Sequence, residues 1–136
     1  MKKIQTLKGK WIVKKKVKKN VSIRGNCVIK KISKYSYEFK EDIKTNIENN
    51  LISGHQIFQI LESKNYINFY LKTGSNKKEK VYSFKKKKFY QSLYFCNKDL
   101  YFAKLKIISK NFFSIYTKIK GPKKNLGIFA NYYRTI

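Results

Sequence analysis

The chain has 136 residues, the size of a single domain, and 42% of them are apolar, enough to form a buried core. It carries 33 Lys and Arg against 7 Asp and Glu, a formal net charge of +26, with two cysteines, six glycines and one proline. These totals exclude a multidomain enzyme, a disulfide scaffold, and a collagen-like or coiled-coil rod.

Apolar and polar residues alternate with period two along most of the chain, which is typical of half-buried β-strands. The alternating runs are, in chain order, Trp11–Val17, Tyr35–Ile43, Tyr66–Leu71, Phe89–Phe95, Tyr101–Ile107 and Phe113–Ile119. The segment Asn46–Leu61 is ambiguous and is the one place where a helix remains possible.

Short polar segments between these runs indicate turns. They are Lys19-Asn20, Lys44–Asn46, Thr73–Lys77, Lys85–Lys88, Asn97–Asp99, Lys110-Asn111 and Gly121-Pro122. Together they predict about nine or ten strands spaced 8–12 residues apart. An open sheet of this length and aromatic content would aggregate at its edges. We therefore predict an all-β fold in which residues 1–136 form one closed or nearly closed antiparallel up-and-down barrel.

The two ends of the chain carry a pair of residues that suits barrel closure. Gly9-Lys10-Trp11 begins the first strand, and Arg134 ends the last one. Arg134 is one of only two arginines among 33 basic residues, which suggests a need for a planar cation at that position. We predict that its guanidinium packs over the indole of Trp11 as a structural plug.

The C-terminal half carries further motifs. Phe89-Tyr90 is followed by Tyr94-Phe-Cys96 and Asp99-Leu-Tyr101; then come Gly121-Pro122-Lys-Lys124 and Tyr132-Tyr-Arg134. With Gly9 and Trp11, these motifs resemble a family of uncharacterised domains with a lipocalin-like (calycin) barrel. That family shows a Phe-His step, His-x-Cys-x-x-Asp-x-Tyr, Gly-Pro-(Arg/Lys)-Lys and a closing Tyr-x-Arg. The resemblance implies a barrel with a small cavity and a polar cluster.

This chain departs from the family pattern at several positions. Tyr90 and Tyr94 stand where the family has His, and Asn125 and Leu126 stand where it has Asp and Tyr. Because tyrosine titrates near pH 10, a metal-binding or proton-transfer role of the histidines would not carry over. A tyrosine can still donate a hydrogen bond and stack on a ligand.

The leading functional hypothesis is a non-enzymatic module that binds a small apolar or aromatic ligand. Its predicted interior is lined by Trp11, Tyr37, Phe39, Tyr94, Tyr101 and Tyr132. The predicted ligand-binding or polar-cluster residues are Trp11, Tyr90, Tyr94, Cys96, Asp99, Tyr101, Lys124, Tyr132 and Arg134. A barrel filled by its own side chains would instead indicate a structural or adaptor role.

The alternative hypothesis is a nucleic-acid- or ribosome-associated protein. Its lysines would contact phosphates, and exposed Tyr66, Tyr70 and Tyr116 would stack on bases. The near absence of arginine weakens this reading, and compositional drift accounts for much of the lysine excess. A third hypothesis is an enzyme whose centre is formed by Cys96, Asp99 and Tyr94.

Location and cofactor use are also predicted. The first residues contain no long apolar run, and no stretch approaches the roughly 20 apolar residues that span a bilayer. Cys27 and Cys96 show no metal-ligand spacing, and His55 is the only histidine. We therefore expect reduced thiols, a cytoplasmic location, no membrane span, no metal and no cofactor.

Overall fold

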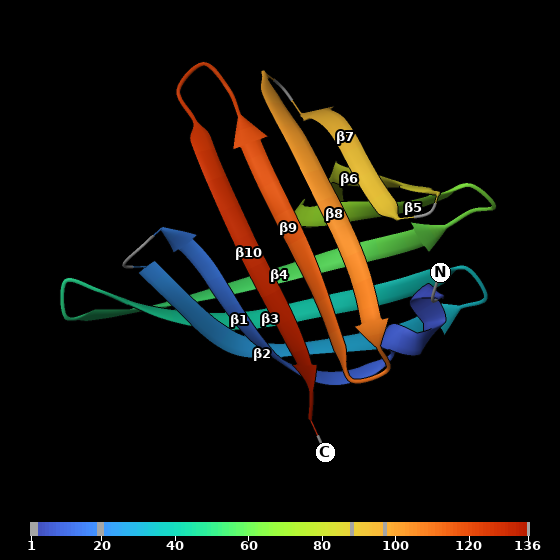
Figure 1. The fold of residues 1–136 in the computed structure, drawn as a ribbon, viewed down its shortest axis with the longest axis horizontal. Coiled ribbons are helices and arrows are strands. Elements are labelled where there is room, and N and C mark those ends of the chain that lie inside the picture. Colours follow the sequence, from blue (N-terminus) through green and yellow to red (C-terminus); the bar gives the residue numbers. More distant parts are fainter. Residues whose placement is uncertain (1–2, 19–20, 88, 97, 136) are drawn as a thin grey trace.

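The computed structural model describes residues 3–18, 21–87, 89–96 and 98–135, which form one short 3₁₀ helix and ten strands (Figure 1). The elements are η1 Ile4–Leu7, β1 Gly9–Lys18, β2 Val21–Ser33, β3 Ser36–Ile47, β4 Asn50–Glu62, β5 Tyr66–Gly74, β6 Lys77–Lys86, β7 Tyr90–Cys96, β8 Asp99–Ser109, β9 Phe112–Lys120 and β10 Asn125–Arg134. Each strand pairs antiparallel with its neighbours in the chain, and β10 pairs with β1 to close the ring. The predicted closed up-and-down barrel is confirmed.

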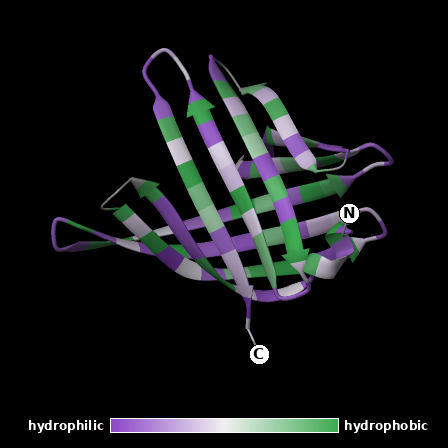
Figure 2. Cartoon of the chain, in the orientation of Figure 1, coloured by the Kyte–Doolittle hydropathy of each residue, from purple (hydrophilic) through white to green (hydrophobic). Residues whose placement is uncertain are grey.

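The alternation in the sequence matches the two faces of the barrel wall. Along β9 the residues at odd positions, from Phe113 to Ile119, are buried, and those between them are partly exposed. Apolar and polar residues alternate in the same way along the strands in Figure 2. Successive side chains of a strand point to opposite faces, so one set fills the interior while the other meets solvent.

One predicted turn is wrong. Lys44–Asn46 lies inside β3, and the chain reverses instead at Glu48 and Asn49, whose φ angles are 52° and 66°. Two residues with positive φ form the tight turn that suits a two-stranded hairpin. The β3–β4 hairpin extends beyond the rest of the barrel (Figure 1), so its polar residues reflect exposure on both faces.

The ambiguous segment Asn46–Leu61 contains no helix: it comprises the end of β3, the turn and nearly all of β4. The predicted turn at Lys19-Asn20 lies outside the described residues. The Thr73–Lys77 segment does contain the predicted reversal, between β5 and β6.

Because neighbouring strands are antiparallel, their turns alternate between two ends of the barrel. One end contains η1, the start of β1 and the end of β10, and we call it the Trp11 end. The opposite end contains the β9–β10 turn, and we call it the Gly121 end. Ile4 and Leu7 of η1 are both 2% exposed, so this helix inserts its apolar side chains into the core at the Trp11 end.

Candidate functional site

Arg134 closes the Trp11 end of the barrel. Its guanidinium carbon lies 4.2 Å from the centroid of the Trp11 ring, within the range of a cation–π contact. The same guanidinium donates hydrogen bonds to the carbonyls of Lys110 (2.7 Å), Lys8 (2.7 Å) and Thr6 (2.6 Å). The indole Nε1 of Trp11 donates to the Leu7 carbonyl at 2.8 Å. The predicted packing of Arg134 on Trp11 is present, and it ties η1 to β1, β10 and the β8–β9 turn.

Gly9 is required for this closure. Its φ angle is +129°, which side chains of L-residues rarely adopt. A Cβ at this position would lie 2.5 Å from an Arg134 guanidinium nitrogen. The Gly-x-Trp spacing therefore places a residue without a side chain and the face of an aromatic ring under the same guanidinium.

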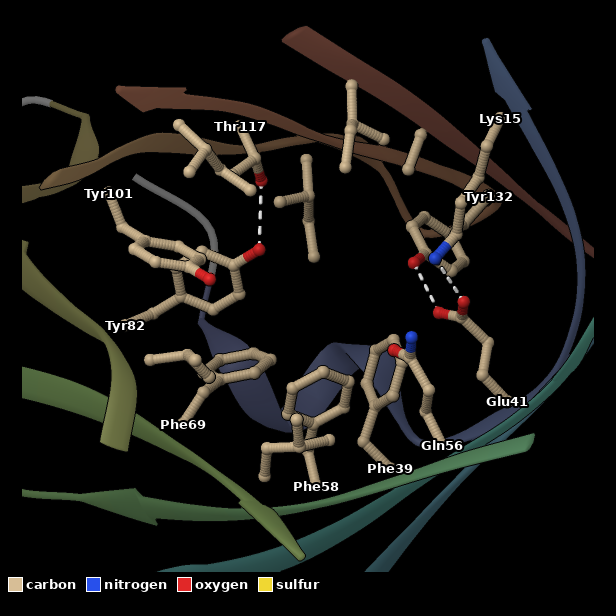
Figure 3. A pocket seen from close by; sticks show the side chains of 16 residues that line it. Lys15, Phe39, Glu41, Gln56, Phe58, Phe69, Tyr82, Tyr101, Thr117 and Tyr132 are labelled. Atoms are coloured by element: carbon tan, nitrogen blue, oxygen red, sulfur yellow. Dashed lines mark hydrogen bonds and ion pairs between the residues drawn. The ribbon is translucent and has the colours of Figure 1, made fainter. Parts of the chain in front are cut away.

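The barrel interior contains a cavity of about 210 Å³ (Figure 3). It begins at the level of Tyr132 and reaches Tyr101 and Ile119, which pair near the Gly121 end. Its wall is mainly aromatic and aliphatic. The aromatic rings that line it are those of Phe39, Phe58, Phe69, Tyr82, Tyr101 and Tyr132. The rings contact one another edge to face, with Phe39 and Phe58 centroids 5.7 Å apart, which holds the cavity wall in shape.

A charged cluster forms one side of this cavity. Glu41 is 1% exposed, and one of its carboxylate oxygens is ion-paired with the ammonium of Lys15. The other oxygen accepts a 2.6 Å hydrogen bond from the Tyr132 hydroxyl. Gln56 lies beside these groups in Figure 3. Each charge of this pair has an opposite charge in contact with it, as burial requires.

A second polar group lies on the opposite side of the cavity. The hydroxyls of Tyr82 and Thr117 form a 2.9 Å hydrogen bond, and Tyr101 lies next to Tyr82 in Figure 3. The Phe39, Phe58 and Phe69 rings lie between the two polar groups. The cavity therefore combines two polar sides with an aromatic floor, the usual composition of a small-molecule site.

The phenols and the thiol around the cluster stay protonated at neutral pH. Burial, and next the charge of Glu41, raises the pKa of Tyr132 well above its ordinary value. Burial raises the pKa of Tyr82 to about 12. Burial and then Glu41 also raise the pKa of the Cys27 thiol. Glu41 thus accepts a hydrogen bond from a neutral phenol, and Cys27 is not an activated nucleophile.

The predicted ligand-binding residues are spread along the barrel axis. Tyr132 and Tyr101 line the cavity, whereas Trp11 and Arg134 belong to the closure at the Trp11 end. Among the predicted interior residues, Phe39 lines the cavity. Tyr37 is 1% exposed and lines a different hollow, at the Trp11 end, together with Tyr90. The structure therefore does not bring these residues together around one pocket, because the motifs lie at different levels of the barrel.

Tyr94 was predicted to line the interior, but it is not among the cavity residues. It is partly buried on β7, opposite Tyr101 of β8, and the Lys80 ammonium lies 5.4 Å from its ring centroid. On this side of the barrel Tyr101 lines the cavity and Tyr94 does not.

Asp99 and Lys124 meet at the Gly121 end. Their charged groups are 3.5 Å apart, and a Cβ on Gly121 would clash with an Asp99 carboxylate oxygen. Asp99 therefore packs on Gly121 and links the start of β8 to the β9–β10 turn. Cys96 ends β7, and its side chain lies outside the described part of the chain.

Sequence reasoning missed Lys15 and Glu41. Both lie at positions of their strands that share a face with buried residues: Lys15 follows Trp11 and Val13, and Glu41 follows Tyr37 and Phe39. A charged residue that continues an inward-facing alternation is the signal that would have found them.

The exposed tyrosines of the nucleic-acid hypothesis do not share a face. Tyr66 and Tyr70 lie on β5 and Tyr116 lies on β9, with β6, β7 and β8 between these strands around the barrel. Lysines lie 5.1 Å and 5.8 Å from the Tyr70 ring centroid, so cations of the protein already occupy this ring.

The described ranges contain neither a cluster of metal ligands nor a membrane-spanning helix. No three His, Cys, Asp or Glu side chains there lie close enough together to hold a metal ion. His55 and Asp42 form an exposed pair, 2.6 Å apart. No helix in the same ranges has the length and apolar character to cross a bilayer.

Comparison with protein families gives one match. A model described as "Family of unknown function (DUF6314)" matches residues 7–134, almost the whole chain. Among curated proteins, none matches.

Solved structures with the same fold cover nearly the full chain. The S-type phycobiliprotein lyase CPES from Guillardia theta has a TM-score of 0.66 at 8% identity, over 97% of this chain and 90% of the lyase. A de novo designed fluorescence-activating β-barrel has a TM-score of 0.55 at 11% identity, over 96% of this chain and 95% of the design. A redesigned barrel bound to DFHBI, mFAP0, has a TM-score of 0.56 at 9% identity, over 96% and 100% of the two chains. At these identities the likeness establishes the fold alone.

Proposed function

The chain belongs to the DUF6314 family of unknown function, and we propose that it binds a small, uncharged, planar molecule inside the barrel. The observation that carries this proposal is the cavity of about 210 Å³ between the Lys15–Glu41–Tyr132 cluster and the Tyr82–Thr117 pair. A barrel whose role was only structural would have no need of this space.

The size of the cavity supports a ligand of one or two rings. It exceeds the ~150 Å³ of an engineered apolar cavity that accepts benzene. It lies below the roughly 300–1,000 Å³ that is usual for sites of drug-sized ligands. The rings of Phe39, Phe58 and Phe69 offer edges and faces for an aromatic guest.

The charges of the cluster support an uncharged ligand with a polar head. Lys15 and Glu41 neutralise each other, so a full charge on the ligand would meet no counter-charge. An ammonium carries three N–H donors, and its ion pair with one Glu41 oxygen cannot occupy all of them. The remaining donors, with the Gln56 amide, suit a hydroxyl or carbonyl oxygen on the ligand.

The energetics of the ion pair support a binding role over a stabilising one. Taking two charges out of water costs several kcal/mol per ion, and apolar residues of similar volume often stabilise a protein as well or better. A buried pair in the wall of a cavity is therefore better explained by recognition of a ligand. The designed barrels with the same fold, one of them bound to DFHBI, support this use of a barrel interior by analogy.

A fluorescence titration with 2-naphthol tests the proposal, because this two-ring phenol is uncharged at neutral pH and responds to its surroundings. We expect saturable binding at one site with little dependence on salt. The charged analogue 2-naphthalenesulfonate is the control, since adhesion to the outer lysines would favour it and would weaken between about 50 and 200 mM salt.

The double variant Lys15→Met/Glu41→Leu provides the matched protein control. It replaces the ion pair by apolar side chains but leaves the buried Tyr132 hydroxyl without its Glu41 acceptor, so its free energy of unfolding should fall by about 1–3 kcal/mol while the barrel still folds. We expect it to bind 2-naphthol at least about tenfold more weakly, because the polar head loses its partners. Equal binding by both proteins, or preference for the sulfonate, would refute the proposal.

A further inference from the structure

A second hollow, of about 740 Å³, lies at the Trp11 end, away from the central cavity. Turns of the chain and the segment next to η1 surround it: Lys3 precedes η1, Lys34 and Tyr35 form the β2–β3 turn, and Ser63 and Lys64 follow β4. It shares none of its lining residues with the central cavity. Any ligand bound here would therefore be independent of the molecule proposed above.

The hollow is unusually rich in lysine. The central cavity has one lysine in its lining, and a hollow on the outer face of β8–β10 has two. This one is lined by five lysines and one acidic residue, namely Lys3, Lys31, Lys34, Lys64, Lys86 and Glu62.

Among these lysines, Lys86 is the one that is neutralised. Its ammonium lies 2.7 Å from a Glu62 carboxylate oxygen, and both side chains are 19% exposed. Lys3, Lys31, Lys34 and Lys64 form no ion pair with a carboxylate in the part of the chain that the structure describes. Four positive charges therefore face one concave space, and the acidic group that lines it is already paired.

The aromatic residues of the hollow keep two of these charges in place. Lys31 lies 5.9 Å from the ring centroid of Tyr37, and Lys34 lies 5.3 Å from that of Tyr35. Burial, followed by the charge of Glu62, raises the pKa of Tyr37 and of Tyr90, so both phenols in the lining stay neutral at neutral pH. Cations held over rings lose less conformational entropy when an anion binds.

We propose that this hollow binds the phosphate groups of a small, multiply charged molecule. Several lysines that converge on one space repel each other until an anion with more than one negative charge joins them. Lysine ammonium groups bind phosphate as point charges and need no planar geometry, which suits a site built without arginine. A diphosphate group supplies several charges within the space that the four lysines face.

Calorimetric titration with inorganic pyrophosphate tests this site. The variant Lys31→Gln/Lys34→Gln/Lys64→Gln removes three of its cations, all of them exposed, so the fold should persist. The matched control Lys77→Gln/Lys120→Gln/Lys123→Gln removes three exposed lysines from turns and strand ends at the Gly121 end. Because both variants lose the same net charge, any difference between them reports on the hollow.

We expect the hollow variant to bind pyrophosphate at least about tenfold more weakly and the control to stay within about twofold of the wild type. Equal losses in both variants, or no binding by the wild type, would overturn the proposal.

A single-stranded oligothymidylate of about ten nucleotides distinguishes a nucleic acid as the source of phosphate. It should lose affinity equally in both variants, and selective loss in the hollow variant without an effect on pyrophosphate would overturn the small-molecule assignment. Binding of 2-naphthol should be unchanged throughout.

Discussion

The two halves of the barrel interior use similar aromatic residues for different purposes. At the Trp11 end the rings are in contact: Trp11 and Phe113 centroids lie 4.7 Å apart, and Phe113 stacks on Tyr132 at 4.3 Å. Toward the Gly121 end, Phe69, Tyr82 and their neighbours surround a space of about 210 Å³. Tyr132 belongs to both halves, since one face packs on Phe113 and its hydroxyl binds Glu41.

This difference separates stability from binding. Among the described residues, the packed half contains no charged side chain in its core, and it is closed by η1 and Arg134. The other half, which contains the central cavity, includes the buried Glu41 with its Lys15 partner. Close packing stabilises a core through dispersion and the removal of apolar area from water, whereas a buried charge pair contributes little. We therefore expect substitutions in the packed half to lower stability and those in the half with the central cavity to lower ligand affinity.

The largest effect is expected from Trp11→Ala. The substitution leaves a large void between η1 and Phe113 and removes the surface on which Arg134 packs. Truncation of a buried large aromatic side chain costs about 3–5 kcal/mol. Urea unfolding followed by far-UV circular dichroism measures this loss. A loss below about 1 kcal/mol would show that the closure does not hold the barrel together.

Arg134→Lys tests whether the closure needs a planar fork. A lysine keeps the positive charge but cannot donate in the plane of the guanidinium to the carbonyls of Thr6, Lys8 and Lys110 while it stacks on Trp11. With two of these hydrogen bonds lost, we expect a decrease of about 2 kcal/mol in the free energy of unfolding. An unchanged urea midpoint would mean that charge alone closes this end.

Two alanines permit the same substitution in the two kinds of environment. Ala103 is fully buried and does not line the cavity, whereas Ala130, also buried, does. Overpacking a dense site costs about 1–3 kcal/mol, so Ala103→Leu should be destabilising by that amount. Ala130→Leu should change the free energy of unfolding by less than about 0.5 kcal/mol, because its added carbons enter existing space. Equal costs in urea unfolding would contradict the assignment of Ala130, and not Ala103, to the cavity wall.

A pH-dependent effect is expected as well, namely an alkaline loss of stability from the half that contains the cavity. The pKa of Tyr82 is raised to about 12 by burial, above the value near 10 of an unfolded chain. Above pH ~10 the unfolded chain therefore loses this proton before the folded one does. Stability is retained below that pH and falls as the pH rises toward ~12, by at most about 1.4 kcal/mol per pH unit for one tyrosine. Tyr82→Phe should reduce that slope in urea unfolding between about pH 9 and 11, and an unaltered slope would contradict it.

The fold was predictable because period-two alternation determines which face of each strand is buried. The closure was predictable for a related reason: Trp11 and Arg134 are chemically distinctive and lie at the ends of the first and last strands, which a closed barrel brings together. The turn at Lys44–Asn46 was wrong because polar residues mark solvent exposure, and a hairpin that projects from the barrel is exposed without turning there.

The charged cluster was harder to predict, because it depends on contacts across strands. Glu41 pairs with Cys27 of β2, and Lys15 pairs with Ile23 of the same strand, so the ion pair forms across β2. The register of three strands and the length of the lysine side chain decide this contact, and period-two alternation contains neither. The volume of the cavity likewise depends on how large side chains from opposite walls fit together.

The most direct test of the central cavity as a ligand site is to fill it and measure binding. Wild-type protein and Ala130→Leu are titrated with 2-naphthol under the same conditions, and Ile12→Ala, on the outer face, serves as the control. We predict saturable binding by the wild type and the control and a loss of at least about tenfold in Ala130→Leu. Binding by Ala130→Leu with wild-type affinity would show that the molecule binds elsewhere and would contradict the central claim.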